Sequence, residues 1–200
     1  MTITTAVPSM SKWLEAWQLT KALDKDFGIP EPPDLEAPDT CVYTDADKPL
    51  AEGQVRILRS KYVLRDDYVP MVLLLPWVDG WWLAMPFAPP PFSVPALASE
   101  MSTGSVDVHL KVLQVWNTRS VPTKILLDSW VYGDPMPPAI VQGARQLFGH
   151  LVGGQQLPAD FPFERGPGLP PETPADDPRR AYLKLFRGQF DPLTNDTMEI

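Results

Sequence analysis

Proline constrains this chain more than any other residue. It accounts for 25 of the 200 residues, about two and a half times its ordinary share. Because proline fixes φ and has no backbone N–H, it interrupts helices and is excluded from central strands. The density therefore excludes a helix bundle. Prolines gather between residues 30 and 38 and between residues 158 and 178, and both runs are predicted to be extended connectors.

The acidity of the chain is unevenly distributed. The sequence has 17 basic and 25 acidic residues, a net charge of −8, which argues against a protein whose main task is to coat nucleic acid or an anionic membrane. Residues 1–52 carry −6 and residues 151–200 carry −3, whereas residues 53–150 carry +1. Because the acidity lies in the flanks, charge does not exclude RNA as a partner of the central segment.

Apolar content, cysteine usage and the start of the sequence limit the class of protein. An apolar fraction of 44% is enough to fill a core. The single cysteine, Cys41, excludes an intramolecular disulfide and a Cys-cluster zinc site. The first residues lack a basic stretch followed by an apolar one, and the longest apolar run, near residues 71–77, is too short to span a bilayer. We therefore expect a soluble cytoplasmic protein with no membrane association.

Both flanks contain an apolar stretch that must find a surface to cover. Residues 9–23 are predicted to form a short amphipathic helix, with Trp13 and Trp17 on one stripe. These tryptophans either dock on the rest of the chain or form a partner-binding face. Near the other end, residues 182–186 supply apolar side chains for a docked helix or strand.

Between residues 53 and 130 the pattern becomes that of strands. Strands are predicted at residues 54–59, 69–78, 81–85, 106–112 and 125–132. Asp79-Gly80 predicts a two-residue hairpin turn, and the proline-rich stretch 87–95 predicts a loop or crossing. Residues 106–112 alternate between apolar and polar side chains, so one face is expected in the core. Pro137-Pro138 suits the first turn of a helix that ends near Gly153.

Several kinds of chemistry are excluded by motif. The sequence has no phosphate-binding loop, no dinucleotide fingerprint and no nucleophile elbow. His109 and His150 lack the spacing of metal ligands, and both are expected to be structural. The pairs Asp66-Asp67 and Asp176-Asp177 are expected in solvated turns. We predict no cofactor and no metal.

The arginines of the central segment are the remaining candidates. Four cations lie within ten positions, namely Arg56, Arg59, Lys61 and Arg65, and Arg119 follows a later strand. They are expected to form either a solvated face or a modest phosphate-facing patch.

Five segments in a fixed order carry a family resemblance. They are Gly53-Gln-Val-Arg, Val69-Pro-Met-Val-Leu-Leu, Leu83-Ala-Met-Pro, Leu113-Gln-Val-Trp-Asn-Thr and the helix from Pro138 to Gly153. Their order resembles the MazF/PemK/Kid family, small SH3-like barrels best known as toxin endoribonucleases of toxin–antitoxin pairs. The resemblance covers about half of the chain.

The resemblance also shows where this chain departs from the family nucleases. They commonly carry an arginine directly before the strand proline, whereas Val69 stands here and the nearest arginine is Arg65. Where some members have an Asp-Gln-x-Arg segment, this chain keeps only Gln114, with Arg119 farther along. RNA cleavage by general acid–base chemistry needs a base, an acid and phosphate stabilisation held together. The catalytic candidates implied by the resemblance are therefore Arg65, Gln114 and Arg119, without the expected acid and arginine.

We predict a mainly β chain in three parts. Residues 1–52 form an N-terminal helical arm and linker, residues 53–153 a PemK-like, SH3-like antiparallel barrel with a C-terminal helix, and residues 154–200 a Pro-rich acidic extension that covers the barrel's groove or packs elsewhere. The predicted function is non-catalytic binding or regulation, and the alternative is a diverged toxin-like endoribonuclease. The resemblance implies a homodimer and an antitoxin-like protein partner, with RNA as a further candidate.

Overall fold

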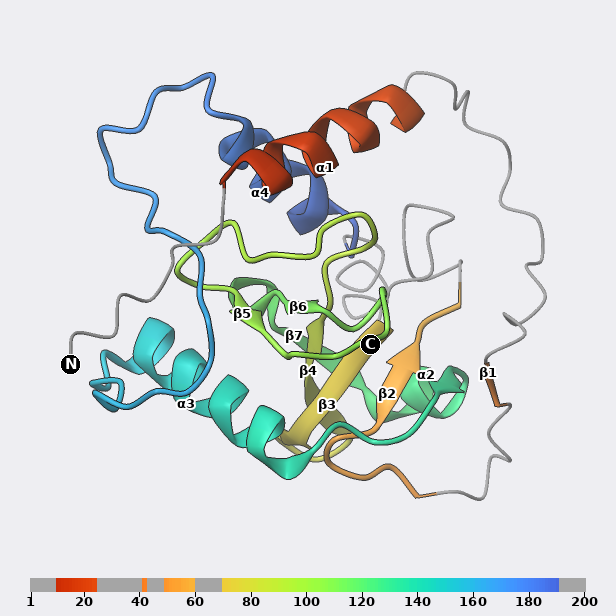
Figure 1. Cartoon of the computed structure of the whole chain (residues 1–200). Coiled ribbons are helices and arrows are strands. Elements are labelled where there is room, and N and C mark those ends of the chain that lie inside the picture. Colours follow the sequence, from red (N-terminus) through yellow and green to blue (C-terminus); the bar gives the residue numbers. More distant parts are fainter. Residues whose placement is uncertain (1–9, 25–40, 43–48, 60–69, 191–200) are drawn as a thin grey trace.

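The computed structural model describes residues 10–24, 41–42, 49–59 and 70–190. In chain order the elements are α1 (Met10–Asp24), β1 (Cys41–Val42), β2 (Val55–Ile57), β3 (Pro70–Pro76), β4 (Trp81–Pro86), β5 (Met101–Ser102), β6 (Val112–Leu113), the 3-10 helix η2 (Val115–Asn117), β7 (Arg119–Pro122), α2 (Thr123–Leu127), β8 (Trp130–Tyr132), α3 (Pro138–Gly153) and α4 (Pro178–Gly188) (Figure 1). Helix makes up 31% and strand 21% of the described residues. The chain is therefore mixed α/β with antiparallel sheets, and the prediction of a mainly β chain is wrong, because the strands are short and three helices are long.

Six strands form one antiparallel sheet in the order β1-β8-β2-β3-β4-β7, and β5 pairs with β6 in a second sheet. The last strand, β8, returns to pair with β2. The outer strands β1 and β7 each have a neighbour on one side only, and no closed barrel is formed by the strands that the structure describes. The antiparallel sheet that we expected is confirmed, and the SH3-like barrel stays a prediction.

Strand β3 is covered on both faces, as its unbroken apolar run predicts. Val72 and Leu74 join the apolar cluster that α3 completes. Met71 and Leu73 point to the other face and join a cluster with α2. The sheet therefore has one core layer on each side.

The turn between β3 and β4 is built on the two residues that the sequence indicates. Asp79 and Gly80 are its central residues, and the N–H of Trp81 donates to the carbonyl of Val78 at 2.9 Å. Only Gly80 has a positive φ, 78°, a conformation that costs glycine little. The hairpin is confirmed.

Helix α3 begins and ends at the predicted residues. Proline occupies its first turn, where the missing N–H has no helical partner to lose, and Gly154 ends it in the left-handed region at φ 63°. Its apolar stripe packs on the sheet, although Leu151 at the end of that stripe is 41% exposed. The buried residues of the helix are Ile140, Val141, Gly143, Ala144 and Leu147.

Helices α1 and α4 pack together over the loop of residues 88–100, at the top of Figure 1 and away from α3. They share an aromatic cluster that consists of Trp13, Trp17, Phe92, Tyr182 and Phe186. The ring of Tyr182 lies 5.5 Å from that of Trp13 and 5.0 Å from that of Phe92, both edge-on. The α1 tryptophans are therefore docked on their own chain, which is the first of the two expectations for them.

The alternating segment 106–112 is not a strand, and only Val112 lies in β6. Val106 is 95% exposed and Val108 is 53% exposed. The reason is local turn chemistry. The N–H of Asp107 donates to the hydroxyl of Ser105 at 3.1 Å, and the side chain of Asp107 accepts from the N–H of His109 at 2.8 Å. Such side-chain bonds compete with a strand ladder.

The segment 125–132 is also not one strand. Pro122 precedes a short helix, α2, whose last turn is closed by the hydroxyl of Ser129, which donates to the carbonyl of Leu126 at 2.5 Å. Only residues Trp130–Tyr132 form a strand. None of the helices in the described part of the chain is long and apolar enough to cross a membrane.

The Pro-rich segment after α3 follows the surface of the domain and is attached to it at several points. The ring of Phe163 lies against Gly143 of α3, so close that an added Cβ there would be 2.2 Å from the ring. The N–H of Ser102 donates to the carbonyl of Glu164 at 2.8 Å. Phe161 and Phe163 pack on the core cluster beside α3. The described part of the extension therefore covers apolar surface.

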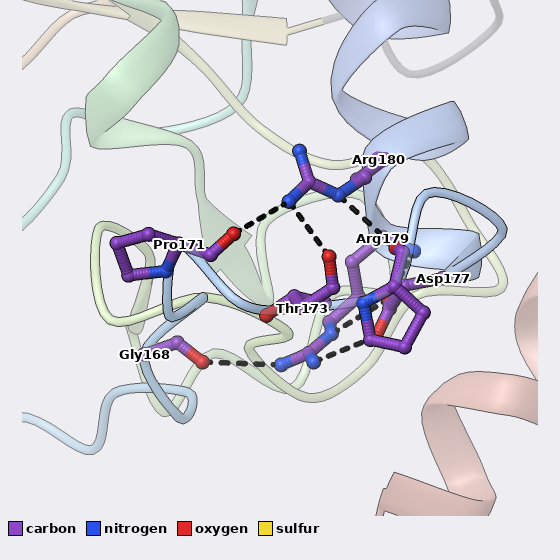
Figure 2. Close-up of polar contacts among 7 residues, drawn as sticks. Gly168, Pro171, Thr173, Asp177, Arg179 and Arg180 are labelled. Carbon is purple, nitrogen blue, oxygen red and sulfur yellow. Dashed lines mark hydrogen bonds and ion pairs between the residues drawn. The ribbon is translucent and has the colours of Figure 1, made fainter.

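Two arginines at the start of α4 fix the end of this segment (Figure 2). The guanidinium of Arg180 donates to the carbonyls of Pro174 and Thr173 at 3.1 and 2.9 Å. Arg179 bonds the carboxylate of Asp177 at 2.8 Å, which lowers the pKa of Asp177 and raises that of Arg179. Proline-rich backbone offers carbonyls without matching N–H donors, and arginine supplies those donors here.

Candidate functional site

The three catalytic candidates that the resemblance implies differ in where they lie. Arg65 lies outside the residues that the structure describes. Gln114, just before η2, is 1% exposed, and Arg119 opens β7. The structure joins Gln114 and Arg119 through Asn117, which donates to the Gln114 amide oxygen at 3.2 Å and accepts from Arg119 at 2.9 Å.

These residues hold the last turn of α4. Asn117 donates to the carbonyl of Phe186 at 3.2 Å, and Arg119 donates to the carbonyl of Arg187 at 2.7 Å. The guanidinium of Arg119 also lies 5.9 Å from the ring centre of Phe190. The last carbonyls of a helix have no partner within the helix. Asn117 and Arg119 supply side-chain donors to them, which is a structural role.

The hydrogen bonds continue from Gln114 to a buried carboxylate. The amide of Gln114 donates to the hydroxyl of Tyr182 at 2.7 Å, and that hydroxyl donates to Glu100 at 2.7 Å. Glu100 and Tyr182 are both 0% exposed. The network therefore links η2, α4 and the loop before β5.

Glu100 accepts hydrogen bonds at both carboxylate oxygens. Oε1 accepts from Tyr182 and from the indole N–H of Trp116, at 2.7 and 3.1 Å. Oε2 accepts from the backbone N–H groups of Ala96 and Leu97 at 2.8 and 3.3 Å. Desolvation nevertheless raises the pKa of Glu100, because burial penalises the ionised form more than these hydrogen bonds favour it. Burial and the Glu100 charge also raise the pKa of Tyr182 well above its usual range.

Above this network lies an open groove of about 790 Å³ beside α4. We call it the α4 groove, and the described residues that line it are Ser99, Trp116, Leu183, Lys184, Arg187 and Gly188. Trp116 links it to the interior, because its indole N–H is held by Glu100. Its volume is in the range of clefts that hold small ligands.

Helix α4 is the most basic element of an acidic chain. Residues 179–187 contain Arg179, Arg180, Lys184 and Arg187 and no acidic residue. The side chains of Lys184 and Arg187 are exposed and one helical turn apart. Counting charge over residues 151–200 as one block hides this group, because the acidic residues around the helix outweigh it. The signal was the unbroken run of basic and apolar residues from 179 to 187.

The expected arginine patch on the first strands is not formed as one surface by the described residues. Arg56 is fully buried, donates to the carbonyl of Leu126 at 3.1 Å, and has its pKa lowered by desolvation. Arg59 is exposed and pairs with Asp128 at 3.2 Å. Lys61 lies outside the described residues, as Arg65 does.

The histidines lie apart from the groove residues. The ring of His109 packs edge-on against Tyr132, and Nδ1 of His150 lies 2.6 Å from the carbonyl of Gln155 at the end of α3. Within the described ranges, no three His, Cys, Asp or Glu side chains are grouped as metal ligands would be.

A second, smaller hollow of about 280 Å³ lies at the tip of the β3–β4 hairpin, between Trp77, Trp81 and Thr123. Trp77 is 56% exposed there.

Comparisons with protein-family models, with curated proteins and with solved structures found no match to this chain. The candidate site is therefore the α4 groove. It combines two exposed cations, Lys184 and Arg187, with the ring of Trp116, which is hydrogen-bonded to the buried Glu100.

Proposed function

We propose that this chain is a non-catalytic binding protein built on a PemK-like, SH3-like β unit, with the α4 groove as its binding face. The strand order supports the SH3-like part of the proposal. The last strand of the sheet, β8, pairs with the early strand β2, and a hairpin and a short helix connect the strands between them. Pairing between a late strand and an early strand is one of the contacts by which a sheet closes into a barrel.

One observation carries the non-catalytic part. Gln114 and Arg119, the described residues that a ribonuclease would use, are engaged in hydrogen bonds that fix α4. Gln114 is buried under that helix at 1% exposure. A catalytic acid, base or phosphate ligand must reach the substrate, so these contacts favour a scaffold role for both residues.

The proposed binding face consists of the accessible side chains of the α4 groove. Lys184 and Arg187 are exposed on α4, and Trp116 and Leu183 are partly exposed beside them. Binding sites combine apolar area with a few polar groups that fix orientation. The α4 groove has this composition.

The experiment is an RNA cleavage assay. Purified wild-type protein is incubated with a long single-stranded RNA, beside the variants R119A and R65A/R119A and the control K124A, an exposed lysine on α2. We expect the RNA to stay as intact as in buffer with every protein. Cleavage by wild type and K124A that falls by about tenfold or more in R65A/R119A contradicts the proposal and supports the toxin-like endoribonuclease. Equal cleavage by all four indicates a contaminating nuclease and supports the proposal.

A further inference from the structure

Resting on the binding role proposed above, we infer that the α4 groove takes an acidic peptide segment of a partner protein, with carboxylates on Lys184 and Arg187 and a large apolar side chain against Trp116 and Leu183. The two cations stand at positions three apart on the helix, so they lie on one face. Both line the same groove as Trp116 and Leu183.

The two cations are available to a ligand. Lys184 and Arg187 are exposed, and neither side chain has a hydrogen bond or an ion pair with another described residue. The other two α4 arginines differ, because Arg179 and Arg180 are engaged with Asp177 and with backbone carbonyls. Among the described residues, no acidic side chain is therefore paired with these two groove cations.

The acidity of the rest of the chain favours the binding of an acidic ligand at this pair of cations. Outside residues 179–187 the chain carries 13 basic and 25 acidic residues. A ligand with a few carboxylates at one end is attracted to α4 and repelled by the acidic residues of the two flanks, which favours one position. Complementary charge of this kind sets orientation and association rate more than affinity.

The apolar half of the groove supplies the affinity. Trp116 is anchored from below, because Glu100 holds its indole N–H at 3.1 Å and Tyr182 packs edge-on against its ring at 6.3 Å. A pre-positioned aromatic ring loses little entropy when a ligand covers it. Leu183 extends this surface along α4.

The same features disfavour single-stranded RNA as the occupant. A nucleic-acid groove follows a phosphate backbone with a row of cations and offers several rings for base stacking. The α4 groove has two cations and one aromatic residue among its described lining, on a chain of net charge −8. A peptide with a few carboxylates and an apolar anchor fits this sparse charge better.

The test is a selection from displayed random peptides on the full-length wild-type protein, followed by affinity measurements on the selected peptides. The variant K184E/R187E reverses the groove's charge, and K124E is the matched control. We expect selected peptides rich in Asp and Glu with a Leu, Phe or Trp, weakened about tenfold or more by K184E/R187E and unchanged by K124E. Peptides with each Asp and Glu replaced by Lys should bind K184E/R187E better than wild type.

Each other result overturns the inference. Selected peptides without acidic residues, or equal binding to wild type and K184E/R187E, place the peptide elsewhere, while the binding role itself stands. Failure to select any peptide removes the peptide-binding groove. A labelled single-stranded RNA that binds wild type and is lost in K184E/R187E assigns the groove to nucleic acid. The proposed function fails separately, through the RNA cleavage assay, so the two failures are distinguishable.

Discussion

The hydroxyl of Tyr182 donates a 2.7 Å hydrogen bond to the carboxylate of Glu100, 82 residues away in the sequence, and neither side chain reaches solvent. This bond connects the C-terminal helix to the loop that leads into β5. Gln114 donates to the same hydroxyl, so Tyr182 both gives and receives a hydrogen bond in an apolar surrounding. A buried network of this kind is stabilising only while all its members are paired.

Replacing Tyr182 by Phe should therefore destabilise the protein without changing its shape. The variant leaves the Glu100 carboxylate without one donor and the Gln114 amide without its acceptor, so the free energy of unfolding should fall by about 2–3 kcal/mol. Urea unfolding monitored by circular dichroism measures it. The control is Y132F, which removes a partly exposed hydroxyl bond to Asp107 and should cost about 1 kcal/mol or less. Equal losses in the two variants would show that the Glu100 network adds nothing.

Glu100 should also give the protein a characteristic pH dependence. Its pKa is raised in the folded state, so between the ordinary carboxylate value and the raised one the folded chain binds more protons than the unfolded chain. Stability from this group is full below the ordinary pKa and is lost as the pH rises through the raised value. As the pH rises through that interval, we expect the unfolding free energy of wild type to fall relative to that of E100Q. A difference that does not vary with pH contradicts this prediction.

Two glycines of α3 provide a matched pair. A Cβ at Gly143 would lie 2.2 Å from the Phe163 ring, whereas a Cβ at Gly149 would meet the end of the flexible Gln155 side chain at 2.5 Å. G143A should cost about 1–3 kcal/mol, because a packed ring has to move. G149A should be neutral or stabilising by up to about 1 kcal/mol, because alanine favours a helix over glycine. Thermal unfolding of the two variants compares them, and a G143A as stable as G149A would show that the Phe163 segment is not held against α3.

The docking of α1 rests on its buried tryptophans. Trp13 is 1% exposed, whereas its neighbour Leu14 is 38% exposed. W13A should lower the free energy of unfolding by about 3 kcal/mol or more, and L14A should change it by less than about 1 kcal/mol. Limited proteolysis should cut W13A faster within the α1 region. If the two variants behave alike, α1 does not contribute to the stability of the described fold.

Where local signals agree with one another, the sequence is sufficient to predict the structure. Helix α3 has proline in its first turn, glycine after its end and an apolar stripe between them, and its limits match the prediction. The Asp79-Gly80 turn and the aromatic stripe of α1 were predictable for the same reason. The prediction of a strand at residues 106–112 was wrong, because Ser105 and Asp107 form side-chain turns that alternation of polarity does not reveal.

The candidate site was less predictable, because its parts come from distant positions. A glutamate such as Glu100 is ordinarily expected at the surface. Here it is buried, because Trp116 and Tyr182 supply donors from elsewhere in the chain in addition to the nearby backbone N–H groups. The family resemblance points to Gln114 and Arg119, but their hydrogen bonds to α4 depend on where the C-terminal extension packs. The basic residues of α4 are adjacent in the sequence, but the net charge of the whole segment 151–200 is negative and does not reveal them.

The contact between α1 and α4 has a consequence for how the protein is made. Synthesis proceeds from the N-terminus, so Trp13 and Trp17 leave the ribosome long before Tyr182 and Phe186, their partners in the aromatic cluster. Until the last residues emerge, the indole rings of α1 have no native cover from α4, and uncovered apolar surface promotes aggregation during folding. Helix α4 thus completes the burial of the α1 tryptophans, so this part of the core can form only after α4 has been synthesised.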